Sequence, residues 1–223
     1  QMCIRDRFRN YVRFQTEFHP RVNLIYGENA QGKTNLLEAV AYLSTASSHR
    51  ARYDREMIML GVDGAFVKGE VRSRDRDFTL EARLNRGARR QLWSNGVRLK
   101  TAGELSGILN TVLFCPEDLY LIREGGAARR RFLDSAICQL RPRYEQALSE
   151  YNRLYDHKVR ILRDWQENLS LLSTLDDFNL RMAQTGALIV HYRAHFIRRL
   201  QESAPAIHRD FSGGKEELSL RYE

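Results

Sequence analysis

The residues with the clearest chemistry run from Gly27 to Thr34, Gly-Glu-Asn-Ala-Gln-Gly-Lys-Thr, and fit the pattern GxxxxGK[ST]. Glycines in this pattern let the backbone curl so that successive N–H groups point toward one anion. We expect Lys33 to reach the β- and γ-phosphates of a nucleoside triphosphate and the Thr34 hydroxyl to bind Mg²⁺. The predicted site consists of Gly27, Glu28, Asn29, Ala30, Gln31, Gly32, Lys33, Thr34 and Asn35.

The segments on either side of this loop are of the kind that the motif requires. Residues 22–26 (Val-Asn-Leu-Ile-Tyr) form a short apolar run, which predicts a buried strand. Residues 35–43 place apolar side chains on one side of a helix, whose N-terminus carries a partial positive charge. A chance glycine turn does not explain a strand, a loop and a helix in this order, so the sequence predicts a phosphate-binding loop.

Three other segments resemble motifs that accompany such a loop, and each has an alternative. Residues 112–118 are an apolar run followed by two acids, as in a Walker B strand, but a proline intervenes. Residues 105–107 open like an LSGGQ signature and continue with the wrong residues. Residues 211–215 (FSGGK) are closer, but a signature serine begins a helix, and the residues that follow here alternate like a strand. A turn leading into a strand is the alternative.

The rest of the first half reads as strands, and the second half as helices. Asn95-Gly96 is a strong hairpin signal because a type I′ turn needs positive φ at both central residues. Thr101 and Glu104 predict a capped helix to residue 109. Strands are expected at 12–18, 65–71, 77–84, 89–94, 97–99, 111–115 and 217–222, and helices from about 128 to 162, broken at Pro142, and from 176 to 200.

The composition limits the functional classes. The chain has 223 residues and a net charge of +8, and arginine greatly outnumbers lysine. No run approaches the roughly 18 apolar residues of a membrane-spanning helix. Three scattered cysteines exclude a disulfide framework and a cysteine zinc site, and no other ligand spacing suggests a metal beyond Mg²⁺ with ATP. We expect a cytoplasmic protein with no membrane partner. The arginine excess suits phosphate or nucleic-acid contacts, but an arginine-rich genome would also explain it.

Several segments together resemble the bacterial RecF family of recombination-repair proteins. They are Phe8-Arg9-Asn10-Tyr11, HPRVNLIYGENAQGKTNLLEAV at 19–40, Ser48-His49-Arg50 and FCPEDLYLIREGGAARRRFLD at 114–134. That family resembles the Rad50/SMC branch of ABC ATPases. The resemblance therefore implies an α/β fold: a P-loop ABC-type ATPase lobe with an antiparallel β-meander and a helical lid subdomain. It also implies Mg²⁺-ATP, an ATP-dependent homodimer that closes around DNA at single-strand gaps, and action with RecO and RecR to help load RecA.

The resemblance also predicts a division of the chain. Residues 8–118 would be the first part of the ATPase domain and 119–223 the helical lid. Residues 1–7 (QMCIRDR) do not look like the family's apolar first strand, so we expect a non-native start and a missing or damaged sheet strand. Family members continue past the length of this chain, with the signature and Walker B acids in the remainder. We therefore expect this chain alone to bind ATP weakly and to hydrolyse it negligibly.

Other residues acquire expected roles by the same resemblance. Arg9 and Asn10 match positions near the bound nucleotide, although exposure on an edge strand is an equal alternative. Glu117 and Asp118 stand where ABC ATPases have a Q-loop, which couples magnesium to the lid, or they are simply acids at a helix N-terminus. Residues 48–50 would lie near nucleotide or DNA, or form a loop held by backbone contacts.

DNA contacts are expected on the lid helices. Residues 129–163 contain nine Lys or Arg against four acids, which suits sequence-independent phosphate contacts. The alternative is a solvated helix face, or arginines paired with acids inside the lid. The candidate DNA-binding residues are Arg129, Arg130, Arg131, Lys158 and Arg160.

A P-loop kinase with a helical lid is the competing function. Such an enzyme would need a pocket for a phosphate acceptor, and no segment suggests one. The β-meander that follows the P-loop helix is also unlike the βαβ alternation of kinases.

Overall fold

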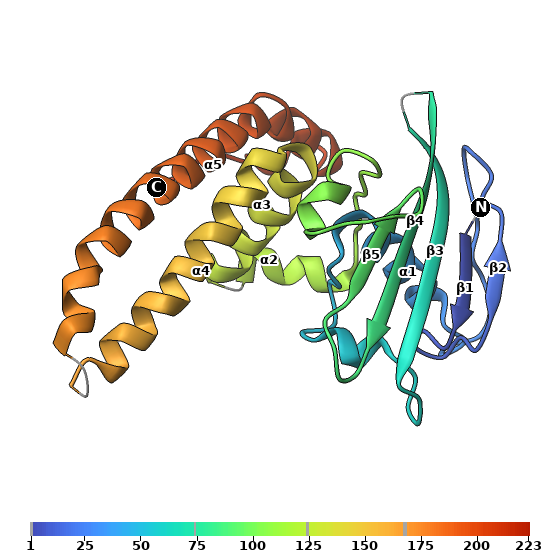
Figure 1. Cartoon of the computed structure of the whole chain (residues 1–223). Coiled ribbons are helices and arrows are strands. Elements are labelled where there is room, and N and C mark those ends of the chain that lie inside the picture. The colour runs from blue at the N-terminus through green and yellow to red at the C-terminus, as the bar shows by residue number, and fades with distance from the viewer. Residues whose placement is uncertain (1, 74, 124, 167–168) are drawn as a thin grey trace. The chain divides into compact units, whose positions relative to one another are not determined.

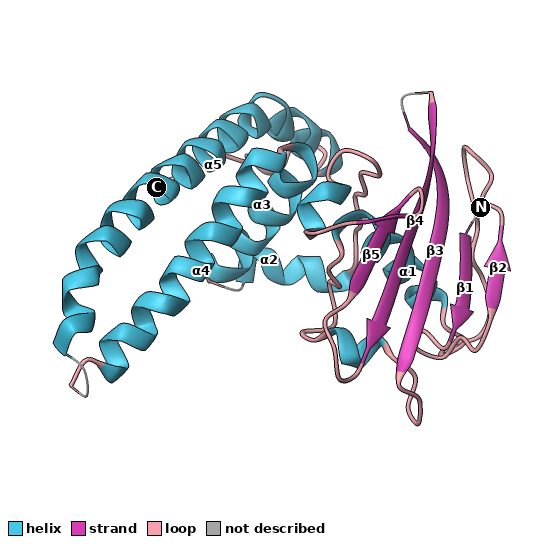
Figure 2. Ribbon diagram, viewed as in Figure 1, coloured by secondary structure: helices cyan, strands magenta, loops and turns pink. Residues whose placement is uncertain are grey.

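The computed structural model describes residues 2–73, 75–123, 125–166 and 169–223. The chain forms two compact units, Gln1–Asp118 and Leu119–Glu223. The first contains the strands and one long helix, and the second contains only helices (Figures 1 and 2). Among the described residues, no helix is long and apolar enough to cross a bilayer.

The first unit is built on a six-stranded antiparallel sheet with the order β2-β1-β3-β4-β5-β6. The predicted meander is confirmed, and in its last turn Asn95 and Gly96 have φ values of 51° and 77°, as a type I′ turn requires. The strands are β1 (Met2–Asp6), β2 (Phe14–Thr16), β3 (Gly64–Ser73), β4 (Arg76–Asn85), β5 (Gln91–Ser94) and β6 (Val97–Arg98).

Strand β1 contradicts the expectation that a sheet strand is missing or damaged at the start of the chain. It lies between β2 and β3, where Met2 pairs with Thr16 on one side and with Gly69 on the other. Met2 is also part of the core. Strand pairing uses backbone N–H and C=O groups, so the polar residues of this segment do not prevent it from joining the sheet.

Helix α1 (Lys33–Thr45) covers one face of the sheet (Figure 2). It buries Leu36, Ala39 and Leu43 in one core with the alternate residues of the strands, among them Val67 and Leu80. The helix and the central strands approach closely at one glycine of β3. A Cβ on Gly69 would lie 2.7 Å from a Leu43 methyl group. The sheet therefore packs closely against the C-terminal part of α1.

Two predicted buried strands are absent. Residues 22–26 and 111–115 are irregular, and no strand among the described residues pairs with either. Val22, Leu24 and Tyr26 are 79–84% exposed, and Phe114 is 78% exposed. An apolar run predicts burial only if a neighbouring surface covers it, and the six-stranded sheet provides none here.

The remaining short elements of the first unit are single 3₁₀ turns. The carboxylate of Glu104 accepts the Thr101 N–H at 2.8 Å, as the capping pattern predicts, but the helix is shorter than expected. The three turns are η1 (Asp54–Met57), η2 (Ala102–Leu105) and η3 (Pro116–Leu119).

The second unit is a group of helices whose longest members are α4 and α5. Pro142 is the first residue of α4, so the predicted break between two helices is confirmed. Leu133, Ile137, Tyr144 and Ile189 form its core. The helices are α2 (Tyr120–Arg123), α3 (Gly126–Leu140), α4 (Pro142–Asp164), η4 (Leu169–Thr174) and α5 (Leu175–Phe211).

One polar cluster joins α3, α4 and α5 inside this unit. The guanidinium of Arg193 donates two hydrogen bonds of 2.9 Å to the carboxylate of Asp134. The buried Tyr144 hydroxyl donates to the same carboxylate. Burial and this acidic neighbour raise the pKa of Tyr144 well above its usual value. The cluster fixes the three helices to one another by one carboxylate.

The candidate signature at residues 211–215 is wrong. Helix α5 ends at Phe211, and Ser212 is its C-cap, with its N–H donating to carbonyls of the last turn. Gly213 and Gly214 have φ values of 62° and 76°, as residues just beyond a helix often do. The serine ends a helix instead of beginning one. The strand expected at 217–222 is also absent, since these residues are irregular.

Candidate functional site

The phosphate loop is shaped by three residues with positive φ. Gly27, Ala30 and Gly32 have φ values of 143°, 66° and 103°. Gly32 is the N-cap of α1, which begins at Lys33. The loop therefore ends where the first N–H groups of the helix have no intrahelical acceptor and can bind an anion.

The Lys33 ammonium lies over this loop. Its Nζ donates to the carbonyl oxygens of Gly27 and Glu28 at 2.7 and 2.6 Å. Thr34 follows it in the first turn of α1. The predicted motif residues are thus brought together by one loop and one helix N-terminus. An ammonium and backbone N–H groups can donate hydrogen bonds to phosphate oxygens, and a hydroxyl oxygen can bind Mg²⁺. The residues therefore fit Mg²⁺-ATP.

Asn10 packs against the loop at Gly32. A Cβ on Gly32 would lie 2.6 Å from Asn10 Oδ1, so a larger residue there would have to displace the Asn10 side chain. Asn35 donates from Nδ2 to the same oxygen at 2.9 Å, and Tyr11 donates its hydroxyl to the Gly32 carbonyl at 3.2 Å. The segment before β2 is therefore in direct contact with the phosphate loop.

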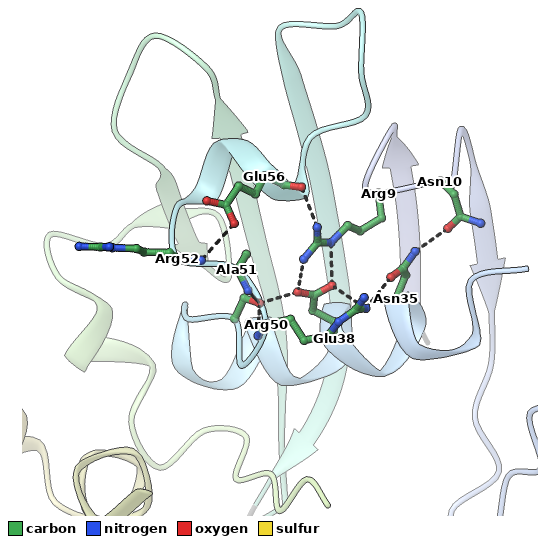
Figure 3. Close-up of polar contacts among 9 residues, drawn as sticks. Arg9, Asn10, Asn35, Glu38, Arg50, Ala51, Arg52 and Glu56 are labelled. Carbon is green, nitrogen blue, oxygen red and sulfur yellow. Dashed lines mark hydrogen bonds and ion pairs between the residues drawn. The ribbon is translucent and has the colours of Figure 1, made fainter. Parts of the chain in front are cut away.

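Arg9 forms an ion pair with Glu38, a buried residue of α1. Its Nε and Nη2 donate to the two carboxylate oxygens of Glu38 at 2.8 and 2.7 Å (Figure 3). Its Nη1 donates to the Glu56 carbonyl at 2.8 Å. Arg9 has a φ of 56°, a left-handed conformation that costs a non-glycine residue about 1 kcal/mol. These contacts hold the arginine in that conformation.

Glu38 is completely buried and accepts from more than one partner. The Ser48 hydroxyl donates to its Oε1, and Nη1 of Arg50 lies 4.0 Å from its Oε2. Burial alone raises the pKa of Glu38, but the hydrogen bonds from Arg9 and Ser48 and the charges of Arg9 and Arg50 outweigh it. The pKa is therefore lower than usual. Glu38 is charged at neutral pH.

The loop after α1 is fastened to the same carboxylate. The Ser48 hydroxyl oxygen accepts the N–H groups of Arg50 and Ala51 at 3.0 and 2.8 Å. Arg50 extends to the first turn of α1, where its Nη1 donates to Asn35 Oδ1 at 3.0 Å (Figure 3). Ser48 and Arg50 thus contact Glu38 and Asn35 of α1 through their side chains, and the predicted proximity of residues 48–50 to nucleotide or DNA stays a prediction.

Glu38 was missed by the sequence reasoning. It is the one charged residue in the stretch 34–48 and stands in an otherwise apolar run of the helix. A lone acid in such a run indicates a buried partner. The sequence does not show that the partners are Arg9, 29 positions earlier, and Arg50.

Comparison with known proteins places this site in a family. The sequence profile described as "AAA domain" matches residues 6–188, which are most of the chain and include the phosphate loop and the residues around Glu38. The chain belongs to this AAA domain family.

The chain is also similar to RecF proteins from several bacteria. It is 41% identical to the "DNA replication and repair protein RecF" of Agathobacter rectalis over 98% of this chain and 60% of that protein. It is 38% identical to the protein of the same name from Lachnoclostridium phytofermentans, over 98% and 61%. The chain thus spans about three fifths of the length of these relatives, and the predicted resemblance to RecF is confirmed.

Solved structures give the same answer for the fold of this AAA domain. A structure described as the recombination mediator protein "RecF-ATPrS in RecFOR pathway" superposes with a TM-score of 0.86 at 33% identity, covering 95% of this chain and 57% of that one. The corresponding RecF-ATP structure gives 0.85. The α/β P-loop ATPase fold is therefore confirmed, and the kinase alternative finds no support.

The Q-loop candidates Glu117 and Asp118 lie in the 3₁₀ turn η3. Asp118 Oδ2 accepts the Cys115 N–H at 2.6 Å, as a carboxylate at the start of a short helix does. The side chain of Glu117 lies outside the described residues. The observed contact of Asp118 fits the helix-terminus alternative, and a Q-loop role stays a prediction.

The candidate DNA-binding residues lie on two helices of the second unit. Arg129, Arg130 and Arg131 are exposed on α3, and Arg160 is exposed on α4. Lys158 is half-buried and donates from Nζ to Asn179 of α5 at 2.6 Å. Its ammonium thus joins two helices in the structure, and any contact with DNA would add to that role or replace it.

Proposed function

We propose that this chain is an ATP-binding, DNA-binding module of DNA replication and repair. The observation that carries the proposal is the loop from Gly27 to Thr34 at the N-terminus of α1, in a chain 41% identical to a RecF protein. Lys33 would bind the β- and γ-phosphates, and the Thr34 hydroxyl would help hold Mg²⁺. Among the described residues, no cluster of His, Cys, Asp or Glu offers another metal site.

The wider activity follows from the RecF relatives and is part of the same proposal. The whole protein would form a homodimer around ATP and close on DNA at single-strand gaps. With RecO and RecR it would help to load RecA. In this chain, Arg129, Arg130, Arg131, Lys158 and Arg160 would contact DNA phosphates, which requires cations and no base recognition. Arg9, Asn10 and residues 48–50 would support the nucleotide.

Nucleotide binding is tested first, because the other steps depend on it. The fluorescence anisotropy of a labelled ATP is titrated with the chain in Mg²⁺, with Lys33→Ala as the variant and Lys100→Ala as a control at an exposed lysine outside the loop. We expect binding that Lys33→Ala weakens at least about tenfold, equivalent to about 1.4 kcal/mol. Equal affinity of the wild type and Lys33→Ala would refute the proposed site.

DNA binding is tested with a charge-reversal triple variant, Arg129→Glu, Arg130→Glu and Arg131→Glu. The matched control reverses Arg198, Arg199 and Arg209, three arginines of α5 in the same unit. Binding of labelled duplex DNA is measured over a series of salt concentrations. If α3 contacts phosphates, only the first variant has a shallower dependence of log K on log salt. If both variants lose affinity equally, the α3 site is wrong and only net charge matters.

A further inference from the structure

Glu38 is a buried carboxylate on the P-loop helix, and it joins two segments that are distant in the sequence. One is the segment before β2, which contains Arg9, and the other is the loop after α1, which contains Ser48 and Arg50. Both segments also reach the first turn of α1 on their own. We call the following residues the Glu38 network: Arg9, Asn10, Asn35, Glu38, Ser48 and Arg50 (Figure 3).

The network leads from Glu38 to the phosphate loop by short steps. Arg50 lies 4.0 Å from Glu38 and donates to Asn35 at 3.0 Å. Asn35 donates to Asn10 at 2.9 Å, and Asn10 fills the space in which Gly32 would carry a Cβ. The Glu38 network therefore forms a continuous series of side-chain contacts between the carboxylate and the loop backbone.

The burial of Glu38 shows that the carboxylate is not a surface ion pair. Its side chain is inaccessible to solvent, while the side chains of Arg9 and Arg50 are 19% and 41% exposed. A buried acid is tolerated only with hydrogen bonds and opposite charges, and Arg9 and Ser48 supply both. A helix-core position of this kind is otherwise filled by an apolar side chain, as at Leu36 and Ala39. Packing alone therefore does not explain why a charged side chain, which is costly to bury, occupies this position.

We propose that Glu38 is a positioning residue of the phosphate site. Its carboxylate holds Arg9, the chain neighbour of Asn10, and Arg50, which donates to Asn35 in the first turn of α1, so that the loop is preorganised for the nucleotide. The inference rests on the proposed nucleotide binding at this loop, which Lys33→Ala tests separately. Glu38 itself is buried behind the loop and does not touch the ligand.

Two variants at Glu38 separate positioning from charge. Glu38→Gln removes the negative charge, and Glu38→Asp keeps the charge but is too short to span Arg9 and Ser48 together. Under the proposal both variants weaken labelled ATP binding about tenfold, since each loses at least one hydrogen bond to a charged group. Under a purely electrostatic role, Glu38→Gln would tighten binding and Glu38→Asp would leave it unchanged. Either of those results overturns the proposal.

The control is Glu70→Gln, which neutralises an exposed acid of β3 in the same unit. We expect unchanged affinity for this variant. All titrations are made well below the melting temperature of each variant, so that loss of folded protein does not imitate weak binding. If Glu38→Gln and Glu70→Gln have the same affinity as the wild type, Glu38 only stabilises the fold.

A second measurement needs no nucleotide. Hydrogen–deuterium exchange is followed in the peptide that contains Arg50 and Ala51, whose N–H groups donate to Ser48 Oγ. We expect this peptide to exchange faster in Glu38→Gln than in the wild type, while a peptide from β4 is unchanged. If exchange is faster in Glu38→Gln but neither the wild type nor the variant binds ATP, the proposed nucleotide binding is refuted. The role of Glu38 in positioning the loop after α1 then still stands. If exchange in the peptide is unchanged, the positioning itself is refuted.

Discussion

At the scale of single residues, Gly32 is constrained twice. Its φ of 103° disfavours any L side chain, and a Cβ would lie 2.6 Å from Asn10 Oδ1. We expect Gly32→Ala to lower the free energy of unfolding by about 1–3 kcal/mol. The control is Gly87→Ala, where a Cβ meets no atom within 4 Å and φ is not in the positive region. Urea unfolding that ranks the two variants equally would contradict the constraint.

The stability contributed by Glu38 depends on pH, and its sign follows from the lowered pKa. A carboxylate with a lower pKa in the folded state stabilises the protein above its unfolded-state pKa. That contribution disappears as the pH falls through the folded value. At pH 7 we expect Glu38→Gln to cost about 3 kcal/mol, because Arg9 loses its buried partner. The difference from the wild type in urea unfolding should shrink below about pH 4. A difference that is the same at pH 7 and pH 3 would show that folding does not lower the pKa of Glu38.

At the scale of elements, sequence prediction succeeded where the determining contacts are local. The β3–β6 meander follows from alternation and the Asn95-Gly96 turn, and α4 begins at Pro142. Strand β1 was not predicted, because its polar residues do not resemble a sheet strand. It forms because strand pairing with β3 uses backbone groups and tolerates polar side chains. The phosphate loop was predicted residue by residue since its chemistry is local. The Glu38 network was not, because its residues come from three separate segments: the one before β2, helix α1 and the loop after α1.

The element scale also gives a test of the second unit. Tyr144 of α4 donates its hydroxyl to Asp134 of α3, which in turn pairs with Arg193 of α5. Tyr144→Phe keeps the ring and removes the hydroxyl, which donates to Asp134 and accepts from Arg193 Nε at 3.1 Å, so we expect a loss of about 1.5–3 kcal/mol in unfolding free energy. Helical circular dichroism during urea unfolding measures it. Tyr155→Phe, an exposed tyrosine of the same helix, serves as the control. Equal midpoints would show that the hydroxyl contributes nothing.

At the scale of the whole molecule, large apolar side chains are exposed in two clusters of residues that are neighbours in the sequence. Val22, Leu24, Tyr26, Val112 and Phe114 are between 78% and 102% exposed in two irregular segments. Both segments have the composition of buried strands, and neither is paired within the described residues. Exposed apolar segments of this kind favour association with another surface. We therefore expect these two segments to promote self-association of the chain.

The consequence is measurable as self-association of the 223-residue chain. We expect the weight-average mass in sedimentation to rise with concentration, because exposed apolar side chains bind other copies of the chain. We also expect the dye ANS to fluoresce in native buffer, because the same side chains bind the dye. Leu24→Ser combined with Phe114→Ser should reduce both signals. Leu60→Ser combined with Phe211→Ser is the matched control, since these two residues are 90% and 88% exposed but lie outside the two segments. A wild type that is monomeric and gives no ANS fluorescence would contradict this prediction. If both double variants reduce the signals equally, the association reflects general apolar exposure and not the two strand-like segments.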